Sequence, residues 1–229
     1  MKSRLLLFDI DGTLISTHGI PRTAMGAVLQ RRYDNFNYND VFNFSGRTDW
    51  EIIEHLLRYD NRQVAPEIVK EIMSEFVTEL EIKLNHGKKP HIFPGVIELL
   101  NQLANMDHVC LGLVTGNISK GAYIKLSAAD LLDYFPVGSY GDDARHRSDL
   151  PPIAISRAEK YFRQNYDKNK IWIIGDSIHD VSCARDNGLR ALAVSTGWTD
   201  HATLATSEPD YLVEDLSDVP GIIDILTVF

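Results

Sequence analysis

The chain has 229 residues, a length that suits one sizeable domain or a core domain that carries a smaller insert. Hydrophobic residues make up 44% and charged residues 24%, and these values exclude a disordered, collagen-like or coiled-coil protein. The formal net charge is −9, and the sequence contains no long cluster of Lys and Arg residues. Both observations argue against a nucleic-acid or anionic-membrane partner.

The N-terminal residues and the cysteines indicate where in the cell the protein is found. Residues 1–4 lead directly into an apolar run and lack the small-residue cleavage site of a signal peptide. No apolar stretch reaches the roughly 20 residues of a membrane span. Cys110 and Cys183 lie in apolar and helical patterns without CxxC spacing, so we expect two buried thiols. We predict a cytoplasmic protein with no membrane partner, either a monomer or a homodimer.

Short apolar runs alternate with helical patterns along most of the chain. The first run lies within residues 5–15, and four more follow it, at 109–114, 171–174, 191–194 and 211–213. Helical patterns separate the runs, at 94–104, 119–135 and 151–164. The alternation predicts an α/β fold with a parallel sheet that is covered by helices on both faces.

One segment contains helical patterns alone. Residues 16–89 carry them at 22–33, 49–59 and 66–84, and Thr48 with Glu51 has the spacing of a capping box. We therefore predict an inserted α-helical cap domain over residues 16–89 and a core made of residues 1–15 and 90–229.

Two aspartates follow the first apolar run. On a strand Asp9 and Asp11 would point to the same side, and ligands of open α/β sheets bind beyond the carboxyl ends of strands. Like charges held so close need a cation, a shared proton or solvation. A solvated Asp-Gly turn is the alternative interpretation.

Two later runs bring further polar residues to the same edge. Thr115, Gly116 and Asn117 follow the run at 109–114, where a hydroxyl and backbone N–H groups could hold an anion, although Thr115 could also merely cap a helix. Asp176 follows the run at 171–174, and Asp180 lies one helical turn further on, where helix caps are also common.

Together, the three strand ends would converge, and two of them would bring four carboxylates into one cluster, at Asp9, Asp11, Asp176 and Asp180. Such a cluster repels itself unless a divalent cation is present, and oxygen-only ligands suit Mg²⁺. A carboxylate can also attack phosphorus and form an aspartyl-phosphate.

These residues resemble the motifs of the haloacid dehalogenase superfamily of phosphatases. The motifs that carry the resemblance are Asp9-x-Asp11-Gly-Thr13, Thr115-Gly-Asn117 and Gly175-Asp176-x-x-x-Asp180. Within the superfamily, the sequences FPGVIELL and SGRTD are similar to the phosphoglycolate phosphatase-like branch. The resemblance implies a Rossmann-like core, a cap that closes over the active site, and a hydrolase that acts on a small phosphomonoester with Mg²⁺.

The resemblance also implies roles for single residues. Asp9 would be the nucleophile, Asp11 the acid/base, and Thr115 a ligand of the phosphate. Mg²⁺ would bind Asp9, the Asp11 carbonyl and Asp176, with Asp180 acting through water or in support. Gly116, Asn117 and Thr13 are weaker candidates for phosphate binding and support.

One element departs from the family pattern. Most members carry a lysine ahead of the last strand, and this chain has none from Leu126 through Glu159. We assign the role to Arg147, which precedes a helix start at Pro151-Pro152, with Asp149 as its possible cap. Arg145 is the closer rival and Arg157 the poorer one.

Substrate choice is expected to depend on the cap. Arg47 precedes the Thr48 capping box, so its guanidinium is a candidate to bind a substrate carboxylate, unless it is a solvated surface residue. His179 lies between two aspartates and is expected to be a bystander. A sugar phosphomutase, a dehalogenase and a non-catalytic binding module of the same fold are the alternative functions, and the intact acidic set argues against the last.

Overall fold

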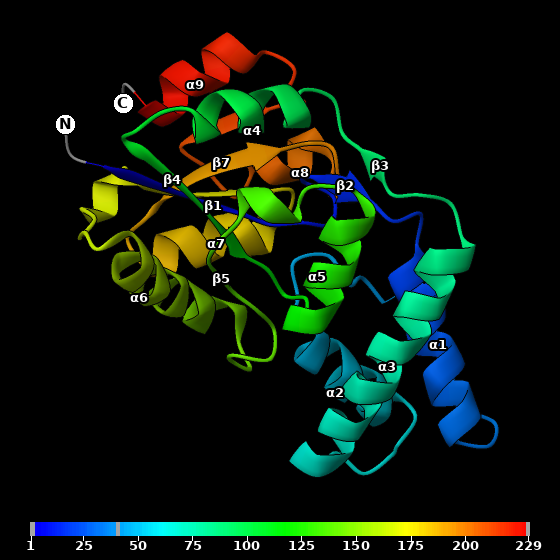
Figure 1. Cartoon of the computed structure of the whole chain (residues 1–229). Coiled ribbons are helices and arrows are strands. Elements are labelled where there is room, and N and C mark those ends of the chain that lie inside the picture. The colour runs from blue at the N-terminus through cyan, green and yellow to red at the C-terminus, as the bar shows by residue number, and fades with distance from the viewer. Residues whose placement is uncertain (1–2, 40–41, 228–229) are drawn as a thin grey trace.

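The computed structural model describes residues 3–39 and 42–227, and a six-stranded parallel sheet runs through its centre (Figure 1). The strand order is β5-β4-β1-β6-β7-β8. The strands are β1 (Arg4–Phe8), β4 (Val109–Val114), β5 (Gly138–Ser139), β6 (Ile171–Gly175), β7 (Arg190–Val194) and β8 (Tyr211–Val213). The predicted α/β class with a parallel sheet is confirmed, since each of the predicted apolar runs forms a strand.

Helices cover both faces of the sheet. Three of them pack on the face to which Leu6 and Phe8 of β1 point, namely α4 (Val96–Ala104), α5 (Ser119–Ala128) and α9 (Val219–Thr227). Three others pack on the face of Leu5 and Leu7, namely α6 (Leu150–Phe162), α7 (Ile178–Asp186) and α8 (His201–Ala205). Strands buried on both faces explain why the runs are continuously apolar.

The helical segment between the first two strands of the sheet has a core of its own. It contains α1 (Ile20–Arg32), α2 (Asp49–Tyr59) and α3 (Pro66–His86), whose buried side chains form a separate hydrophobic cluster. At its two ends β2 (Ile15–Ser16) and β3 (His91–Ile92) pair antiparallel. This arrangement supports the division near residues 16 and 89, which stays a prediction.

Three local predictions differ from the structure. The helical pattern at 119–135 breaks because Asp130 adopts a left-handed conformation, and a separate 3₁₀ turn follows at Leu132–Tyr134. Strand β5 was not predicted, because two residues carry no periodic pattern. Asp149 is the residue before α6, but its side chain makes no capping hydrogen bond.

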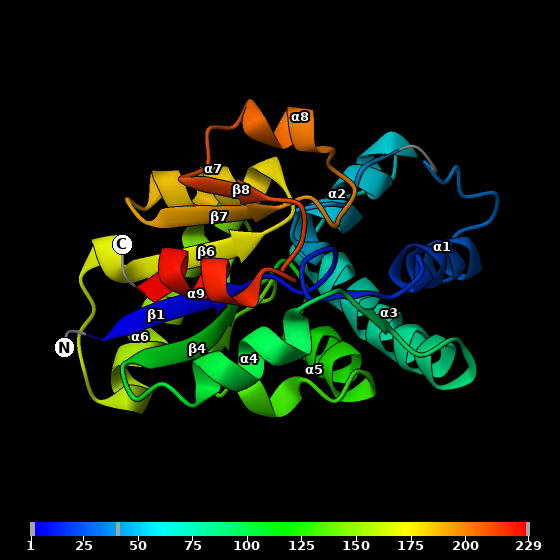
Figure 2. The same cartoon turned by 90° about the horizontal axis from the view of Figure 1, so that it is seen from above.

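The direction of the strands places the helical segment of α1, α2 and α3 beyond the carboxyl edge of the sheet. Figure 2 shows that the carboxyl ends of β6 and β7 point toward the segment that contains α1, α2 and α3. Among the described residues, no helix has both the length and the apolarity needed to cross a membrane. The residues that follow β1, β4 and β6 therefore lie between the sheet and the cap helices.

Candidate active site

Three carboxylates gather where β1 and β6 end. Asp9, Asp176 and Asp180 are buried, and one oxygen of each lies within 4.8 Å of the others. Burial raises the pKa of Asp9 to about 6, although the Arg147 guanidinium acts in the opposite direction. Burial, then the charges of Asp180 and Asp9, raise the pKa of Asp176 well above its usual range. The cluster is therefore costly to ionise unless a cation is bound.

Asp176 has an unused ligand atom. Its Oδ1 accepts a hydrogen bond from Thr13 Oγ1 at 3.2 Å, whereas its buried Oδ2 has no hydrogen-bond partner. The backbone approaches so closely here that a Cβ on Gly12 or Gly197 would lie 2.4 Å or 1.7 Å from that oxygen. A buried, unpartnered carboxylate oxygen beside two further carboxylates suits a hard cation.

Asp180 is fixed by protein contacts. Its Oδ2 accepts hydrogen bonds from Ser177 N at 3.1 Å and Ser177 Oγ at 2.6 Å, which completes a capping box at the start of α7. Its Oδ1 accepts a hydrogen bond from Arg147. The helix-cap interpretation of Asp180 and its place in the acidic cluster are therefore both correct.

Arg147 is the arginine that reaches Asp9. It is buried in a 3₁₀ turn before α6, and its Nη2 lies 3.3 Å from Asp9 Oδ1. Burial acts to lower the pKa of Arg147, but Asp180 and Asp9 raise it above its ordinary value, so the group stays charged. Arg145 instead pairs with Glu54 of α2, and Arg157 pairs with Asp143.

The loop after β4 is tied to the site by side-chain hydrogen bonds. Thr115 is fully buried, and its Oγ1 accepts a hydrogen bond from Asn117 Nδ2 at 2.8 Å. The residue that caps α5 is Ile118, so the alternative in which Thr115 caps this helix is wrong. A Cβ on Gly116 would lie 1.9 Å from the carbonyl oxygen of Arg47, so the cap segment closes directly against this loop.

Asp11 lies outside the group of three carboxylates whose oxygens come within 4.8 Å of one another, although its charge acts to raise the pKa of Asp9. Its Oδ2 accepts hydrogen bonds from Lys125 Nζ at 2.6 Å and Asn117 Nδ2 at 2.8 Å, and its side chain is 35% exposed. Lys125 also donates to Asn117 Oδ1. The tight group therefore holds three of the four predicted carboxylates, and Asp11 pairs with Lys125 beside it.

Lys125 is a residue that sequence reasoning missed. It lies on the buried face of α5 with Gly121, Ala122 and Leu126, and only 2% of its surface is exposed. The sequence of α5 has almost no amphipathic pattern, so it contains no signal that residue 125 faces the interior.

Arg47 lies beside the capping box of α2, which the structure confirms. Its Nε is buried without a hydrogen-bond partner, and its Cζ lies 5.2 Å from the centre of the Phe42 ring. His179 is half-buried nearby, and burial, then the charges of Arg47 and Arg147, lower its pKa. Arg47 is thus partly buried and has one donor without a partner, and its contact with a substrate stays a prediction.

Comparison with known proteins decides the family. The model of haloacid dehalogenase-like hydrolases matches residues 6–194. The chain belongs to the haloacid dehalogenase-like hydrolase family. Phosphoglycolate phosphatase of Synechococcus elongatus is 32% identical over 219 residues, which cover 93% of this chain and 94% of that protein. Pyrophosphatase PpaX of Oceanobacillus iheyensis is 22% identical and covers 97% of this chain and 98% of its own length.

Solved structures of other proteins share the fold. CbbY from Rhodobacter sphaeroides, solved with phosphate, has a TM-score of 0.77 at 18% identity and covers 95% of this chain and 96% of its own. A hydrolase from Pseudomonas syringae has a TM-score of 0.74 at 19% identity and covers 98% and 99%. The predicted Rossmann-like core and the predicted enzyme class, a phosphatase of this family, are confirmed.

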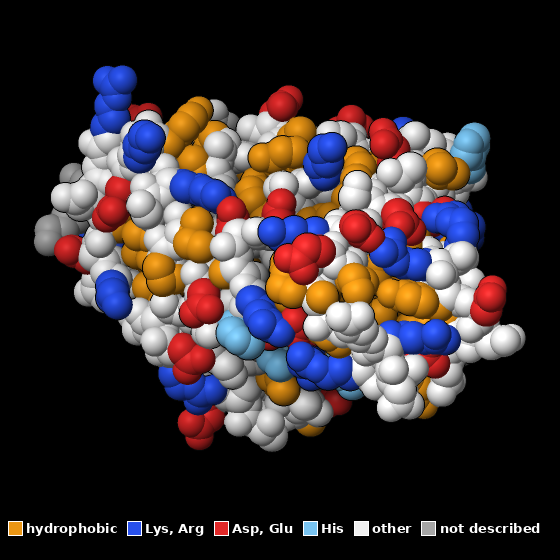
Figure 3. All heavy atoms as spheres, turned by 90° about the horizontal axis from the view of Figure 1, so that it is seen from below, with side chains coloured by type: hydrophobic (Ala, Val, Ile, Leu, Met, Phe, Trp, Pro, Cys, Tyr) orange, Lys and Arg blue, Asp and Glu red, His pale blue; other side chains and the backbone are white. Residues whose placement is uncertain are grey.

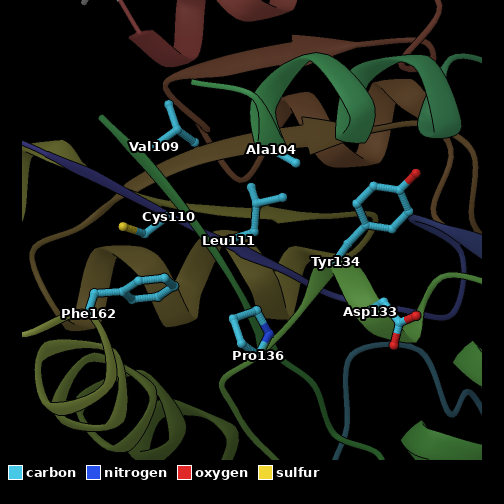
Figure 4. A pocket seen from close by; sticks show the side chains of 8 residues that line it. All are labelled: Ala104, Val109, Cys110, Leu111, Asp133, Tyr134, Pro136 and Phe162. Atoms are coloured by element: carbon cyan, nitrogen blue, oxygen red, sulfur yellow. The ribbon is translucent and has the colours of Figure 1, made fainter. Parts of the chain in front are cut away.

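An apolar hollow elsewhere in this hydrolase lies away from the acidic cluster. It has a volume of about 410 Å³, and Figure 4 shows Val109, Cys110 and Leu111 of β4 among its lining residues. Val109 begins the strand that ends before Thr115, roughly 20 Å away at about 3.3 Å per residue. No predicted site residue lines this hollow, so it is not part of the candidate active site.

Proposed function

We propose that the chain is a Mg²⁺-dependent phosphomonoester hydrolase that acts on a small acidic phosphorylated metabolite through a phospho-aspartate at Asp9. The observation that carries this proposal is the packing around Asp9. A buried guanidinium and two further buried carboxylates surround it, and one carboxylate oxygen is left without a partner. The family and the relatives named phosphatases agree with it.

The donor set fits Mg²⁺. The carboxylates of Asp9 and Asp176 and the carbonyl of Asp11 would hold the ion, with Asp180 acting through water, and all of these donors are hard oxygens. Bound there, Mg²⁺ would supply positive charge next to the phosphoryl oxygens. The raised pKa values of Asp9 and Asp176 support this assignment, since a cation would relieve the repulsion that helps to raise them.

The residues of the chain would divide the reaction into two displacements. An oxygen of Asp9 attacks phosphorus, the ester P–O bond breaks, and Asp11 gives its proton to the departing alkoxide. A water molecule then attacks the same phosphorus and returns a proton to Asp11, and the bond between Asp9 and phosphorus breaks. Alcohol and inorganic phosphate are the products.

The remaining residues of the site would bind the phosphoryl group. Thr115 would contribute a hydroxyl and Gly116 a backbone N–H, whereas Asn117, whose Nδ2 already donates to Asp11 and Thr115, would act in support of them. Arg147 would keep a fixed positive charge beside Asp9, in the place of the usual family lysine.

The cap would select an acidic substrate. Arg47 supports this because its Nε is buried and unpartnered at the boundary of cap and core. The phosphoglycolate phosphatases among the relatives are named for a substrate that carries a carboxylate. A cytoplasmic location and a monomeric or homodimeric state stay predictions.

The proposal is tested by a screen of phosphate release from small phosphorylated acids, sugars and nucleotides, with Mg²⁺ and with a chelator. Release of inorganic phosphate that requires Mg²⁺ and is fastest for phosphorylated acids is expected. Formation of a phosphorylated isomer without phosphate release would contradict hydrolysis and indicate a mutase.

A further inference from the structure

We propose that Lys125 is a positioning residue that holds the proton-transferring carboxyl group of Asp11 in its working orientation. The inference rests on the proposed function, because it assigns Lys125 to the step in which Asp11 protonates the leaving alcohol. The evidence for this inference is the pair of hydrogen bonds that Asp11 Oδ2 accepts.

Asp11 Oδ2 is held by two donors. Lys125 Nζ and Asn117 Nδ2 lie 2.6 Å and 2.8 Å from it, and Lys125 also donates to Asn117 Oδ1. The other oxygen, Oδ1, has a longer contact, 3.3 Å, with Thr17 Oγ1. The two firm bonds fix the plane of the carboxyl group and leave Oδ1 as the oxygen that can carry the transferred proton.

The setting of Lys125 explains why the lysine stays in this position. Its side chain is almost fully buried on α5, so the ammonium group cannot turn to solvent. Asp49, at the start of the cap helix α2, is a second carboxylate that attracts it. Buried charges persist where acidic partners offset their desolvation, and Lys125 has one partner in the core and one in the cap.

A purely structural role would give a different kinetic pattern. An alkoxide is a poor leaving group and needs the proton of Asp11, whereas p-nitrophenolate departs without one. A misplaced Asp11 therefore slows the cleavage of an alkyl phosphate and spares that of p-nitrophenyl phosphate. A distorted fold would slow both. The parameter kcat/KM isolates this step, because it reports events up to the departure of the alcohol.

The test compares kcat/KM of Lys125→Met on 2-phosphoglycolate and on p-nitrophenyl phosphate, with Mg²⁺. We expect a loss of about 10²-fold on the first and less than about threefold on the second. Lys125→Arg, which keeps a charged donor, should recover at least tenfold of that loss. Lys120→Met is the matched control, because Lys120 is exposed on the same helix, and both substrates should be cleaved as by wild type.

Equal losses on the two substrates, or no loss on either, would overturn the proposal. Thermal melting shows whether each variant is folded, and Lys125→Gln replaces the Met variant if that one is not. Unfolding of both neutral variants would assign Lys125 a structural role and also overturn it. A wild-type enzyme that releases no phosphate from either substrate contradicts the proposed function, whereas the other outcomes contradict the role of Lys125 alone.

Discussion

Arg147 has two acidic partners, and this pairing sets what its removal should do. The guanidinium contacts both Asp9 and Asp180, and all three groups are buried. Truncating it leaves two carboxylates without their cation, so a loss of stability of about 3 to 5 kcal/mol is expected alongside the loss of activity. Measurements of activity therefore need a temperature at which the variant is folded.

Arg147→Ala should lower kcat/KM by about 10²-fold or more, because one charge partner of the transition state is lost. Arg147→Lys should recover part of the loss, because lysine keeps the positive charge although it lacks the planar guanidinium group. Arg145→Ala is the control, because Arg145 is half-exposed and paired with Glu54. If Arg145→Ala lost most of its kcat/KM and Arg147→Ala stayed close to wild type, the role of charge partner would belong to Arg145 instead.

Arg47 should affect binding of the substrate rather than the chemical step. Arg47→Ala is expected to raise KM for 2-phosphoglycolate by roughly tenfold and to leave KM for p-nitrophenyl phosphate within about twofold, because only the first offers a carboxylate to a charged donor. Arg58→Ala, an exposed arginine paired with Glu54 on α2, is the control. Equal changes in KM for both substrates would argue against a carboxylate contact.

The start of α2 fastens the cap to the core. Asp49 N donates to Gly116 O at 2.8 Å, and Asp49 Oδ2 accepts from Ile118 N at 2.9 Å. Thr48 Oγ1 donates to Arg145 O at 2.9 Å. These bonds hold the first turn of a cap helix against the loop that carries Thr115, so the geometry of the phosphate site depends on the position of the cap.

Asp49 should also make stability depend on pH. Burial raises its pKa to about 6, although Lys125 acts to lower it, so the folded state binds more protons than the unfolded state between the usual value of 3.8 and 6. The free energy of unfolding therefore falls as pH rises through that window. The loss is about 3 kcal/mol at 1.36 kcal/mol per pKa unit.

The variant Asp49→Asn should not show this loss. Its free energy of unfolding relative to wild type should rise by about 2.5 kcal/mol between pH 4 and pH 8, as measured by urea titration. Asp200→Asn is the control, because the pKa of that exposed helix-cap residue is lowered, mainly by the backbone N–H of Thr203. If the free energy of unfolding of Asp49→Asn relative to wild type stayed constant or fell with pH, the pKa of Asp49 would not be raised in the folded protein.

Secondary-structure elements were predictable where residues close in sequence determine them, and not where contacts between distant segments do. The buried strands were predictable because their apolar runs are continuous, and the start of α2 was predictable because Thr48 and Glu51 form a local capping box. The end of α5 was not, since a left-handed Asp130 breaks a pattern that reads as helical through residue 135. Strand β5 pairs at only two positions, so its existence depends on its neighbour β4.

The same distinction applies to the site. The carboxylates at the ends of β1 and β6 were predictable, because parallel strands end at one edge of a sheet. Lys125 was not, since its partners Asp11 and Asp49 lie far away in sequence, and only folding brings a lysine of α5 to them.

Charge is distributed unevenly between the surface and the interior of the molecule. On the face seen in Figure 3, Lys and Arg side chains are interspersed with Asp and Glu. The buried cluster, in contrast, contains three carboxylates and the single guanidinium of Arg147 among its described members. A divalent cation should therefore act on the stability of the whole fold through this cluster.

Mg²⁺ should raise the melting temperature at pH 8. At about 100 times its Kd the gain is about 2.7 kcal/mol, or roughly 5 to 10 °C for a chain of this size. The shift should be smaller at pH 5, because burial raises the pKa of Asp9 to about 6 and that of Asp176 as well, and both must lose protons to bind the ion. Asp176→Asn should abolish the shift, whereas the exposed-cap variant Asp200→Asn should keep it.

The central claim, a phospho-aspartate at Asp9, is tested most directly by trapping it. The variant Asp11→Asn lacks the base that activates water, so p-nitrophenyl phosphate with Mg²⁺ should load it with a phosphoryl group that is not released. After acid quenching, mass spectrometry of the peptides should find that group on the peptide that contains Asp9, and the double variant with Asp9→Asn should carry none. A phosphoryl group on another residue, or turnover by Asp9→Asn within about tenfold of wild type, a difference below about 1.4 kcal/mol, would contradict the account.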